Sequence, residues 1–210
     1  FSVLICSAFS QKKSFACVIG DGFGTMSCLL LQSRYRKGVV AVNLTKTLLV
    51  DLWYIKLLKG HDWFERNVAL LTEENFKNNT RIDLSDYKVV GLEAKNASLI
   101  SELEIDLFFN TVSMQEMPRR SIDDYFKYMR KCATKNPVFL YCCNRLEKTH
   151  PDGTVIKFIE YPWLDDLVIV DELCPWHQYY YGKGGFHIYK KYDGSIWHRL
   201  CQLSSEKSDD

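Results

Sequence analysis

Residues 15–24 read Phe-Ala-Cys-Val-Ile-Gly-Asp-Gly-Phe-Gly, an apolar run that ends in a glycine-rich loop. A continuous apolar run of this length is typical of a strand buried on both faces, as in a parallel sheet. Residues 25–36 then have helical spacing, and Gly38 is expected to end that helix. A strand, a glycine loop and a helix in this order predict the first unit of a doubly wound α/β fold.

The same alternation continues to residue 143. We expect strands at 39–44, 68–71, 89–92, 105–111 and 137–143, and helices at 47–59, 97–103 and 121–134. Residues 162–178 are expected to be irregular, while Asp193-Gly194 between residues 186–192 and 195–200 predicts a hairpin. The sequence therefore predicts a doubly wound, Rossmann-like, mostly parallel sheet with a C-terminal antiparallel hairpin.

The domain organisation is expected to be simple. A length of 210 residues suits one α/β domain, for which we expect the boundaries 15–203. Residues 1–14 form an N-terminal extension, and because the chain begins without Met we expect it to be truncated. Residues 204–210 are polar and are expected to form a flexible tail.

Charge and cysteine content narrow the class of protein. The formal net charge is +1, which gives no long-range attraction to nucleic acid or an anionic membrane, so neither is expected as a partner. No apolar run approaches the ~18 residues of a membrane span. The eight cysteines include no C-x-x-C pair, so no metal site is predicted and we expect reduced thiols in a cytoplasmic protein.

The loop at residues 20–24 is the candidate ligand site. Glycines let a ligand approach the backbone, and the next helix offers free N–H groups at its N-terminus. In such sheets, ligands bind at the carboxyl ends of the strands. The spacing G-x-G-x-G is not the dinucleotide fingerprint, which requires glycine or alanine where Thr25 stands, and no Walker A motif is present.

Several stretches carry a family resemblance. Residues 18–24 (VIGDGFG) resemble motif I of class I S-adenosylmethionine-dependent methyltransferases. Residues 105–118 (IDLFFNTVSMQEMP) and 122–125 (IDDY) are similar to the D-x-x-x-N-x-x-S-x-x-E-M pattern of the sugar O-methyltransferase family. Residues 141–144 (YCCN) and 197–200 (WHRL) also resemble that family. The resemblance implies methylation of a sugar or glycan hydroxyl and leaves the oligomeric state open.

The resemblance also implies which residues bind the cofactor, S-adenosylmethionine. They are Gly20, Asp21, Gly22, Phe23, Gly24, Asn43, Leu44 and Asn110. Val18 and Asn43 depart from the family pattern, which is normally acidic at both positions. An amide at Asn43 accepts a hydrogen bond from a ribose hydroxyl but gives no charge-assisted pair, so we expect cofactor affinity to be weaker by ~1–2 kcal/mol.

Two residues are the catalytic candidates. A sugar hydroxyl is a poor nucleophile at neutral pH, so a general base is expected. Glu116 follows the strand at 105–111 on the expected acceptor side, where a purely structural carboxylate at a helix N-terminus is the alternative. His177 lies in the aromatic run of residues 174–181, which suits stacking on a sugar or simple packing.

Two other functions compete with methyl transfer. A non-catalytic methyltransferase-like binding domain is the first, because Val18, Asn43 and the short N-terminal segment all weaken the cofactor site. A nicotinamide-dependent oxidoreductase is the second, and Thr25 argues against it.

Overall fold

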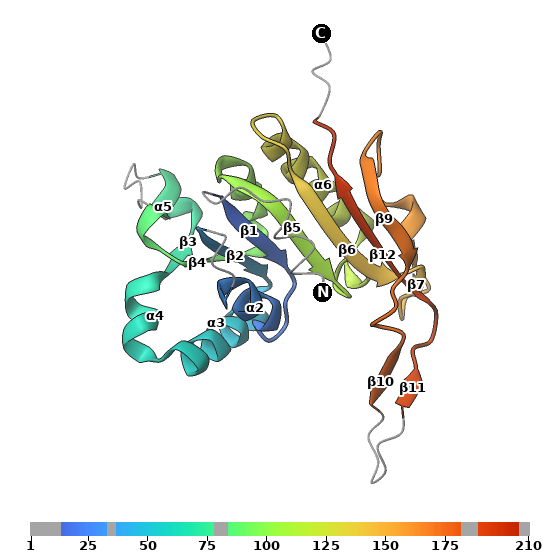
Figure 1. Cartoon of the computed structure of the whole chain (residues 1–210), viewed down its shortest axis with the longest axis horizontal. Helices are drawn as coiled ribbons and strands as arrows, with labels where there is room; N and C mark the ends of the chain where they lie inside the picture. The colour runs from blue at the N-terminus through green and yellow to red at the C-terminus, as the bar shows by residue number, and fades with distance from the viewer. Residues whose placement is uncertain (1–13, 33–36, 78–83, 182–188, 206–210) are drawn as a thin grey trace.

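The computed structural model describes residues 14–32, 37–77, 84–181 and 189–205. Its centre is an eight-stranded sheet with the order β3-β4-β2-β1-β5-β6-β12-β9 (Figure 1). These strands are β1 (Phe15–Ile19), β2 (Gly38–Asn43), β3 (Val68–Leu71), β4 (Val89–Glu93), β5 (Ile105–Thr111), β6 (Phe139–Arg145), β9 (Leu167–Leu173) and β12 (Ile196–Gln202). The six strands from β3 to β6 are parallel, whereas β12 is antiparallel to both β6 and β9. The predicted Rossmann-like, mostly parallel sheet is confirmed.

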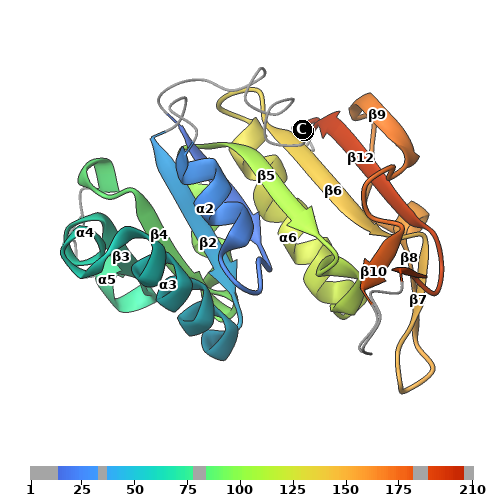
Figure 2. The ribbon, with the colours of Figure 1, turned by 60° about the horizontal axis from the view of Figure 1, so that its bottom comes forward.

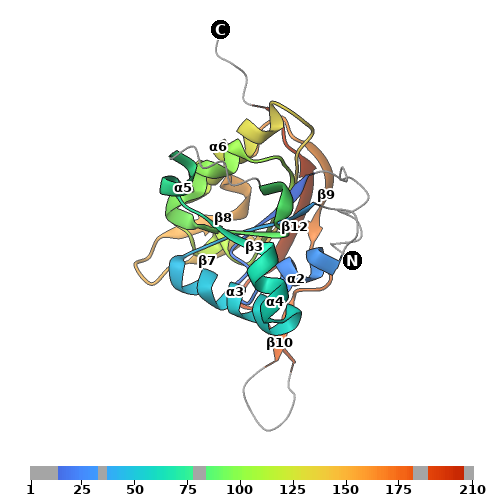
Figure 3. The same ribbon diagram turned by 90° about the vertical axis from the view of Figure 1, so that its left-hand side faces the viewer.

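Helices cover both faces of the sheet. The helices are α2 (Thr25–Gln32), α3 (Thr45–Lys59), α4 (His61–Asn67), α5 (Glu73–Lys77) and α6 (Arg119–Ala133), with 3₁₀ turns η1 (Leu84–Asp86), η2 (Ala94–Glu102), η3 (Met114–Glu116) and η4 (Phe158–Glu160). Figure 2 shows α2 and α3 in front of the sheet, and the side view of Figure 3 places α6 on the opposite face. The sheet is therefore the middle of three layers.

The first strand shows why this arrangement forms. All five residues of β1 are buried, and successive side chains point to opposite faces. Phe15 and Ile19 join the core under α6, while Ala16 and Val18 join the core on the other face. The unbroken apolar run is thus explained, because both faces of this strand need apolar side chains.

The C-terminal third differs from the predicted pairing. An antiparallel hairpin is present, but its strands are β10 (Tyr179–Tyr181) and β11 (Tyr189–Lys191), and Figure 1 shows it extending away from the sheet. The segment after Gly194 instead becomes β12 inside the main sheet. A second small ribbon pairs β7 (Glu147–Thr149) with β8 (Val155–Lys157). Strand β9 lies within the stretch that was predicted to be irregular. The sequence does not reveal this strand because it is an edge strand with exposed apolar side chains on both faces, so its residues do not alternate between apolar and polar.

Some expected segments fall outside the described part of the chain. They are residues 1–13 of the extension, residues 33–36 of the first helix, residues 186–188 of the predicted hairpin and residues 206–210 of the tail. The domain boundaries 15–203 therefore stay a prediction. In the described ranges, no helix combines the length and apolarity needed to cross a bilayer.

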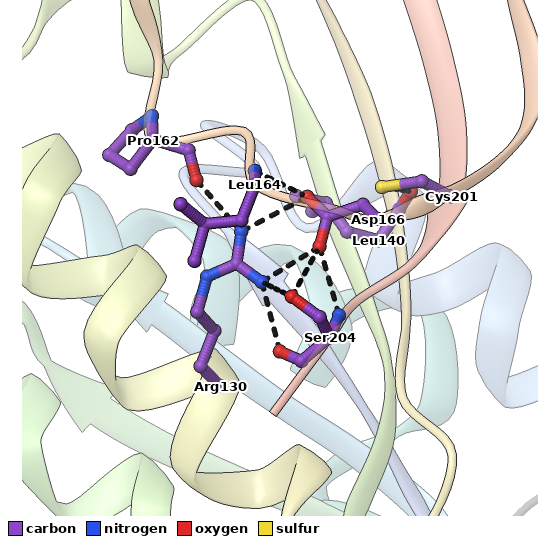
Figure 4. Close-up of polar contacts among 7 residues, drawn as sticks. All are labelled: Arg130, Leu140, Pro162, Leu164, Asp166, Cys201 and Ser204. Atoms are coloured by element: carbon purple, nitrogen blue, oxygen red, sulfur yellow. Dashed lines mark hydrogen bonds and ion pairs between the residues drawn. The ribbon is translucent and has the colours of Figure 1, made fainter. Parts of the chain in front are cut away.

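A buried ion pair fastens α6 to the C-terminal strands. Arg130 Nη1 donates to Asp166 Oδ1 at 2.7 Å, and the two side chains are 3% and 2% exposed. Arg130 also donates to the Pro162 and Ser204 carbonyls, and the Ser204 backbone N–H donates to Asp166 (Figure 4). Burial opposes the charged carboxylate, but the hydrogen bonds from Arg130 and Ser204 outweigh it and lower the pKa of Asp166.

Candidate functional site

A cavity of about 510 Å³ opens at the carboxyl ends of the parallel strands. It is lined by Gly20 and Gly22 after β1, by Asn43 and Leu44 at the end of β2, by Ala94 and Lys95 after β4, by residues 112–113 and 116–118 after β5, and by one face of α6. The chain runs outward from β1 to β2 and β4 and then returns to β5 on the other side of β1. The cavity therefore lies at the switch point where open α/β sheets bind ligands.

The glycine loop is shaped by contacts that only glycine allows. Gly20 has φ +75°, and a Cβ there would lie 2.3 Å from Ser113 Oγ. Gly24 has φ +65°, and its Cβ would lie 2.7 Å from the Asp51 carbonyl oxygen. Gly22 has φ +83° but open space where a Cβ would stand, and it lines the cavity. Two glycines thus allow close packing, while Gly22 leaves room beside the cavity.

Asp21 and Phe23 have different surroundings from those the resemblance implied. The Asp21 carboxylate accepts hydrogen bonds from the backbone N–H groups of Met26 at 2.9 Å and Ser27 at 2.8 Å. It therefore satisfies the free N-terminal donors of α2. Phe23 is 60% exposed and its ring packs edge-on against Tyr54, outside the cavity. Neither side chain lines the cavity.

Asn43 is held by an acidic residue behind it. Its Nδ2 donates to Asp51 Oδ2 at 2.9 Å, and its own Oδ1 accepts the Leu44 N–H at 2.9 Å. The other Asp51 oxygen accepts the Gly24 N–H at 3.0 Å. One carboxylate on α3 therefore connects the glycine loop to the end of β2. Asp51 could not be predicted as part of the site, because it lies among the apolar positions of its helix, and it is 1% exposed.

Asn110 is a buried structural link rather than a free ligand group. Its Nδ2 donates to the Ile19 carbonyl at 2.9 Å and to Ser113 Oγ at 2.5 Å. Its Oδ1 accepts the Met114 N–H at 3.1 Å and Asn144 Nδ2 at 2.8 Å. These bonds join β1, β5 and β6 beneath the cavity, and they place Ser113 rather than Asn110 on its wall.

Val112 has a strained backbone on the cavity wall. Its φ is 57°, which is the only positive φ outside glycine in the described ranges. A β-branched side chain strongly disfavours this conformation, and such strain is concentrated at functional sites. The Val112 N–H donates to the Cys143 carbonyl at 2.7 Å, which holds the turn in place.

Glu116 lines the same cavity with its carboxylate half-exposed. Gln115 Nε2 donates to Glu116 Oε1 at 3.0 Å, and Lys148 Nζ lies 3.4 Å from the same oxygen. Desolvation favours the neutral acid, but Gln115, Lys148 and His150 together lower the pKa of Glu116. The carboxylate is therefore ionised at neutral pH, and it is a good hydrogen-bond acceptor but a weak base.

His177 is not at this cavity. It lies beside a second cavity of about 490 Å³, together with Met26, Thr111, Tyr141, Cys143, Cys174 and Trp176. Its Nε2 is 3.3 Å from the Tyr192 hydroxyl oxygen. The structure thus brings Gly20, Gly22, Asn43, Leu44 and Glu116 together and separates His177 from them.

Several cavity residues were not predicted from the sequence, and four of them carry polar groups that a ligand could meet. Lys95 follows β4, while Asp124, Tyr125 and Tyr128 line the cavity from α6. The α6 residues repeat at helical spacing, but periodicity alone does not tell which helix face lies over the end of a sheet. Across the described residues, no group of three His, Cys, Asp or Glu side chains could hold a metal ion.

Comparison with known proteins supports the fold. No family model and no curated protein matches the chain. Among solved structures, one described as "Conversion of a Disulfide Bond into a Thioacetal Group during Echinomycin Biosynthesis" has a TM-score of 0.60 and 9% identity, over 99% of this chain and 81% of that chain. M. capricolum TrmK, solved with S-adenosylhomocysteine, has a TM-score of 0.54 and 10% identity, over 100% and 72%.

A third structure corrects the expected partners. An rRNA methylase from Streptococcus thermophilus has a TM-score of 0.50 and 11% identity, over 97% of this chain and 95% of that chain. The exclusion of nucleic acid and the choice of a sugar or glycan acceptor were therefore wrong. The net charge sums the whole surface, whereas phosphate groups are bound by local basic residues.

The sugar O-methyltransferase resemblance gains no support, since no family model matches the stretch that carried it. The strand order and the structural similarity agree on a coarser assignment. The chain has the Rossmann-like fold of class I S-adenosylmethionine-dependent methyltransferases.

Proposed function

We propose that the chain is a methyltransferase that binds S-adenosylmethionine in the cavity at the glycine loop. The observation that supports the proposal is that three features lie together at the switch point of the sheet. These are the Cβ-free space at Gly22, the polar end of β2 at Asn43 and the strained turn at Val112. The oxidoreductase alternative is disfavoured, because a dinucleotide fold continues its sheet with parallel strands, whereas β12 is antiparallel here.

The residues of the cavity fit such a cofactor. Gly20 and Gly22 would hold its amino-acid portion close to the backbone, and Asn43 Oδ1 would accept a hydrogen bond from a ribose hydroxyl. Leu44, Ala94 and Ala97 offer an apolar wall for a flat base. When bound, S-adenosylmethionine supplies an electrophilic methyl group on a positively charged sulfur.

Glu116 is the candidate residue for the acceptor. Because its pKa is lowered, we assign it to accepting a hydrogen bond from the acceptor and orienting it, rather than to removing a proton at neutral pH. Its negative charge also favours a sulfonium nearby. His177 has no part in this proposal, because it lies at the other cavity.

Calorimetric titration with S-adenosylhomocysteine tests the cofactor site. We expect binding to the wild-type protein and a loss of about tenfold or more in Gly22→Ala, because the new methyl group would enter the cavity. Gly153→Ala is the matched control, since Gly153 has a similar φ of +87° and equal open space but lies in the β7–β8 turn. Absence of binding at millimolar ligand, or equal losses in both variants, would contradict the proposal.

A non-catalytic binding domain is the second candidate. It is favoured by the internal hydrogen bonds of Asn43. They use its Nδ2 donor and one of the two lone pairs of Oδ1, which leaves less of the side chain free to bind a ribose. Transfer of a labelled methyl group to a panel of RNA oligonucleotides and small nucleophiles separates the two functions. Turnover that falls in Glu116→Gln supports the enzyme, whereas binding without any turnover supports the second candidate.

A further inference from the structure

The ribbon of β10 and β11 carries exposed aromatic and basic side chains, and Figure 1 shows it extending away from the main sheet. Tyr179, Tyr180 and Tyr189 are between 41% and 62% exposed, and Lys190 and Lys191 are exposed as well. A single exposed apolar residue is ordinary on a protein surface. Aromatic rings gathered with cations on one projecting element instead indicate a binding surface.

The strand register divides these side chains between two faces of the ribbon. The strands are antiparallel, with Tyr180 opposite Lys190 and Tyr179 opposite Lys191. Directly opposed residues point to the same face, and successive residues point to opposite faces. Tyr180 and Lys190 therefore share one face, whereas Tyr179, Tyr189 and Lys191 share the other.

The Tyr180 face continues as a row of rings towards the second cavity. The ring centroid of Tyr180 lies 5.0 Å from that of Tyr192, and the Tyr192 centroid lies 5.3 Å from that of His177. His177 lines the second cavity together with Trp176, which is 68% exposed. The row of rings therefore connects the ribbon to the rim of a cavity of about 490 Å³.

Two cations border this row. The Arg145 guanidinium lies over the Tyr192 ring, with its Cζ 5.6 Å from the ring centroid, and Lys190 lies opposite Tyr180. The two strands of the ribbon contain no acidic residue. Among the residues that the structure describes, neither cation forms an ion pair with a carboxylate. Two uncompensated positive charges beside exposed rings favour a partner that is both anionic and flat.

Single-stranded nucleic acid combines these two properties, because its phosphates bind cations and its bases stack on aromatic rings. A duplex fits less well, because its bases are already stacked on one another. A second copy of this chain also fits less well, because a symmetric contact would bring Arg145 and Lys190 of both copies together. RNA is favoured over DNA, because the tyrosine hydroxyls offer hydrogen-bonding groups to a ribose 2′-hydroxyl.

We propose that the Tyr180 face of the ribbon binds single-stranded RNA. Its phosphates lie against Arg145 and Lys190, and its bases stack on Tyr180 and Tyr192. The inference goes beyond the proposed methyl transfer and does not rest on it, because this surface contains none of the residues that line the cofactor cavity.

Fluorescence anisotropy with a labelled, unstructured RNA of about 12 nucleotides tests the proposal. The full chain is titrated without cofactor, so a failure of the cofactor site does not affect the result. We expect Tyr180→Ala to weaken binding at least about fivefold, because one base loses its stacking surface. Tyr179→Ala is the matched control and should bind as the wild type does, since Tyr179 is an exposed tyrosine of the same strand on the opposite face. No binding by the wild type, or equal losses in the two variants, would overturn the proposal.

The salt dependence of binding tests the role of the cations. With one phosphate on Arg145 and one on Lys190, the wild-type Kd should rise about sevenfold between about 50 and 200 mM salt. Lys190→Gln should reduce that rise to about threefold, whereas Lys191→Gln on the opposite face should leave it unchanged. A Kd that does not depend on salt, or the same rise in both variants, would contradict phosphate binding at this face.

Further measurements separate RNA from other occupants. DNA of the same sequence and an RNA duplex should bind more weakly, and polyglutamate should not displace the RNA. Light scattering measures the molecular mass without RNA, and circular dichroism confirms that each variant is folded. DNA, duplex or polyglutamate that binds as tightly as the single-stranded RNA would overturn the proposal. A wild-type dimer that Tyr180→Ala dissociates would overturn it too.

Discussion

At the residue scale, two carboxylates near the proposed cofactor site have opposite pKa shifts. Burial is the main influence on Asp51 and raises its pKa to about 6, against the hydrogen bonds from Asn43 and Gly24. Glu116 is half-exposed and has Lys148 beside it, so its pKa is lowered. The difference follows from position: one carboxylate supports the loop from behind, and the other faces the cavity.

The raised pKa of Asp51 predicts a pH dependence of stability. The folded protein keeps its proton to a higher pH than the unfolded chain, whose Asp pKa is about 3.9, so stability falls as pH rises from about 4 to about 6. We expect the wild type to lose roughly 1–2 kcal/mol relative to Asp51→Asn over this interval. Urea unfolding of both proteins across that pH range measures the difference. A constant difference would contradict the assignment.

At the element scale, Arg130 and Asp166 connect segments that lie far apart in the sequence. The pair joins α6 to the segment before β9 and to Ser204 after β12. Both ions are fully enclosed, so each depends on the other to remain charged inside the protein.

Removing one partner is therefore expected to be costly. Asp166→Leu should lower the free energy of unfolding by about 3–5 kcal/mol, because it leaves the Arg130 guanidinium buried without its counter-ion. The double variant Arg130→Met/Asp166→Leu should recover much of that loss. Arg119→Ala is the control, since its ion pair with Asp123 is about half-exposed and should contribute under about 1 kcal/mol. Denaturant unfolding gives all values, and a double variant as unstable as the single one would contradict this account.

At the scale of the whole molecule, the site is assembled from five separate parts of the chain. The ends of β1, β2, β4 and β5 and one face of α6 line the proposed cofactor cavity. A ligand that contacts all of them binds the folded state only, and it therefore stabilises the whole domain by mass action.

S-adenosylhomocysteine is thus expected to raise the Tm. At a hundred times its Kd it should add about 2.7 kcal/mol, which corresponds to a rise of roughly 5–10 °C for a domain of this size. Differential scanning fluorimetry measures the shift. At the same ligand concentration Gly153→Ala should show the same rise, and Gly22→Ala should show about half of it or less, because a tenfold weaker Kd lowers the stabilisation to about 1.4 kcal/mol. A ligand-independent Tm in the wild type would count against a cofactor site in this cavity.

The sequence by itself determined the central sheet and part of the site. The apolar run of β1, the glycine loop and the strand β5 are local patterns, and burial on both faces leaves little choice of residue there. Gly20, Gly22, Asn43, Leu44 and Glu116 were found because they follow strands, and the ends of parallel strands meet at one edge.

Only the tertiary structure decided the rest. The supporting role of Asp51 and the separation of His177 from the cavity depend on elements far apart in the chain. The place of β12 between β6 and β9 depends on them too, because its partners are chosen by long-range packing rather than by the Asp193-Gly194 turn. Local patterns specify how a segment folds, but the contacts between distant segments decide which side chains share a site.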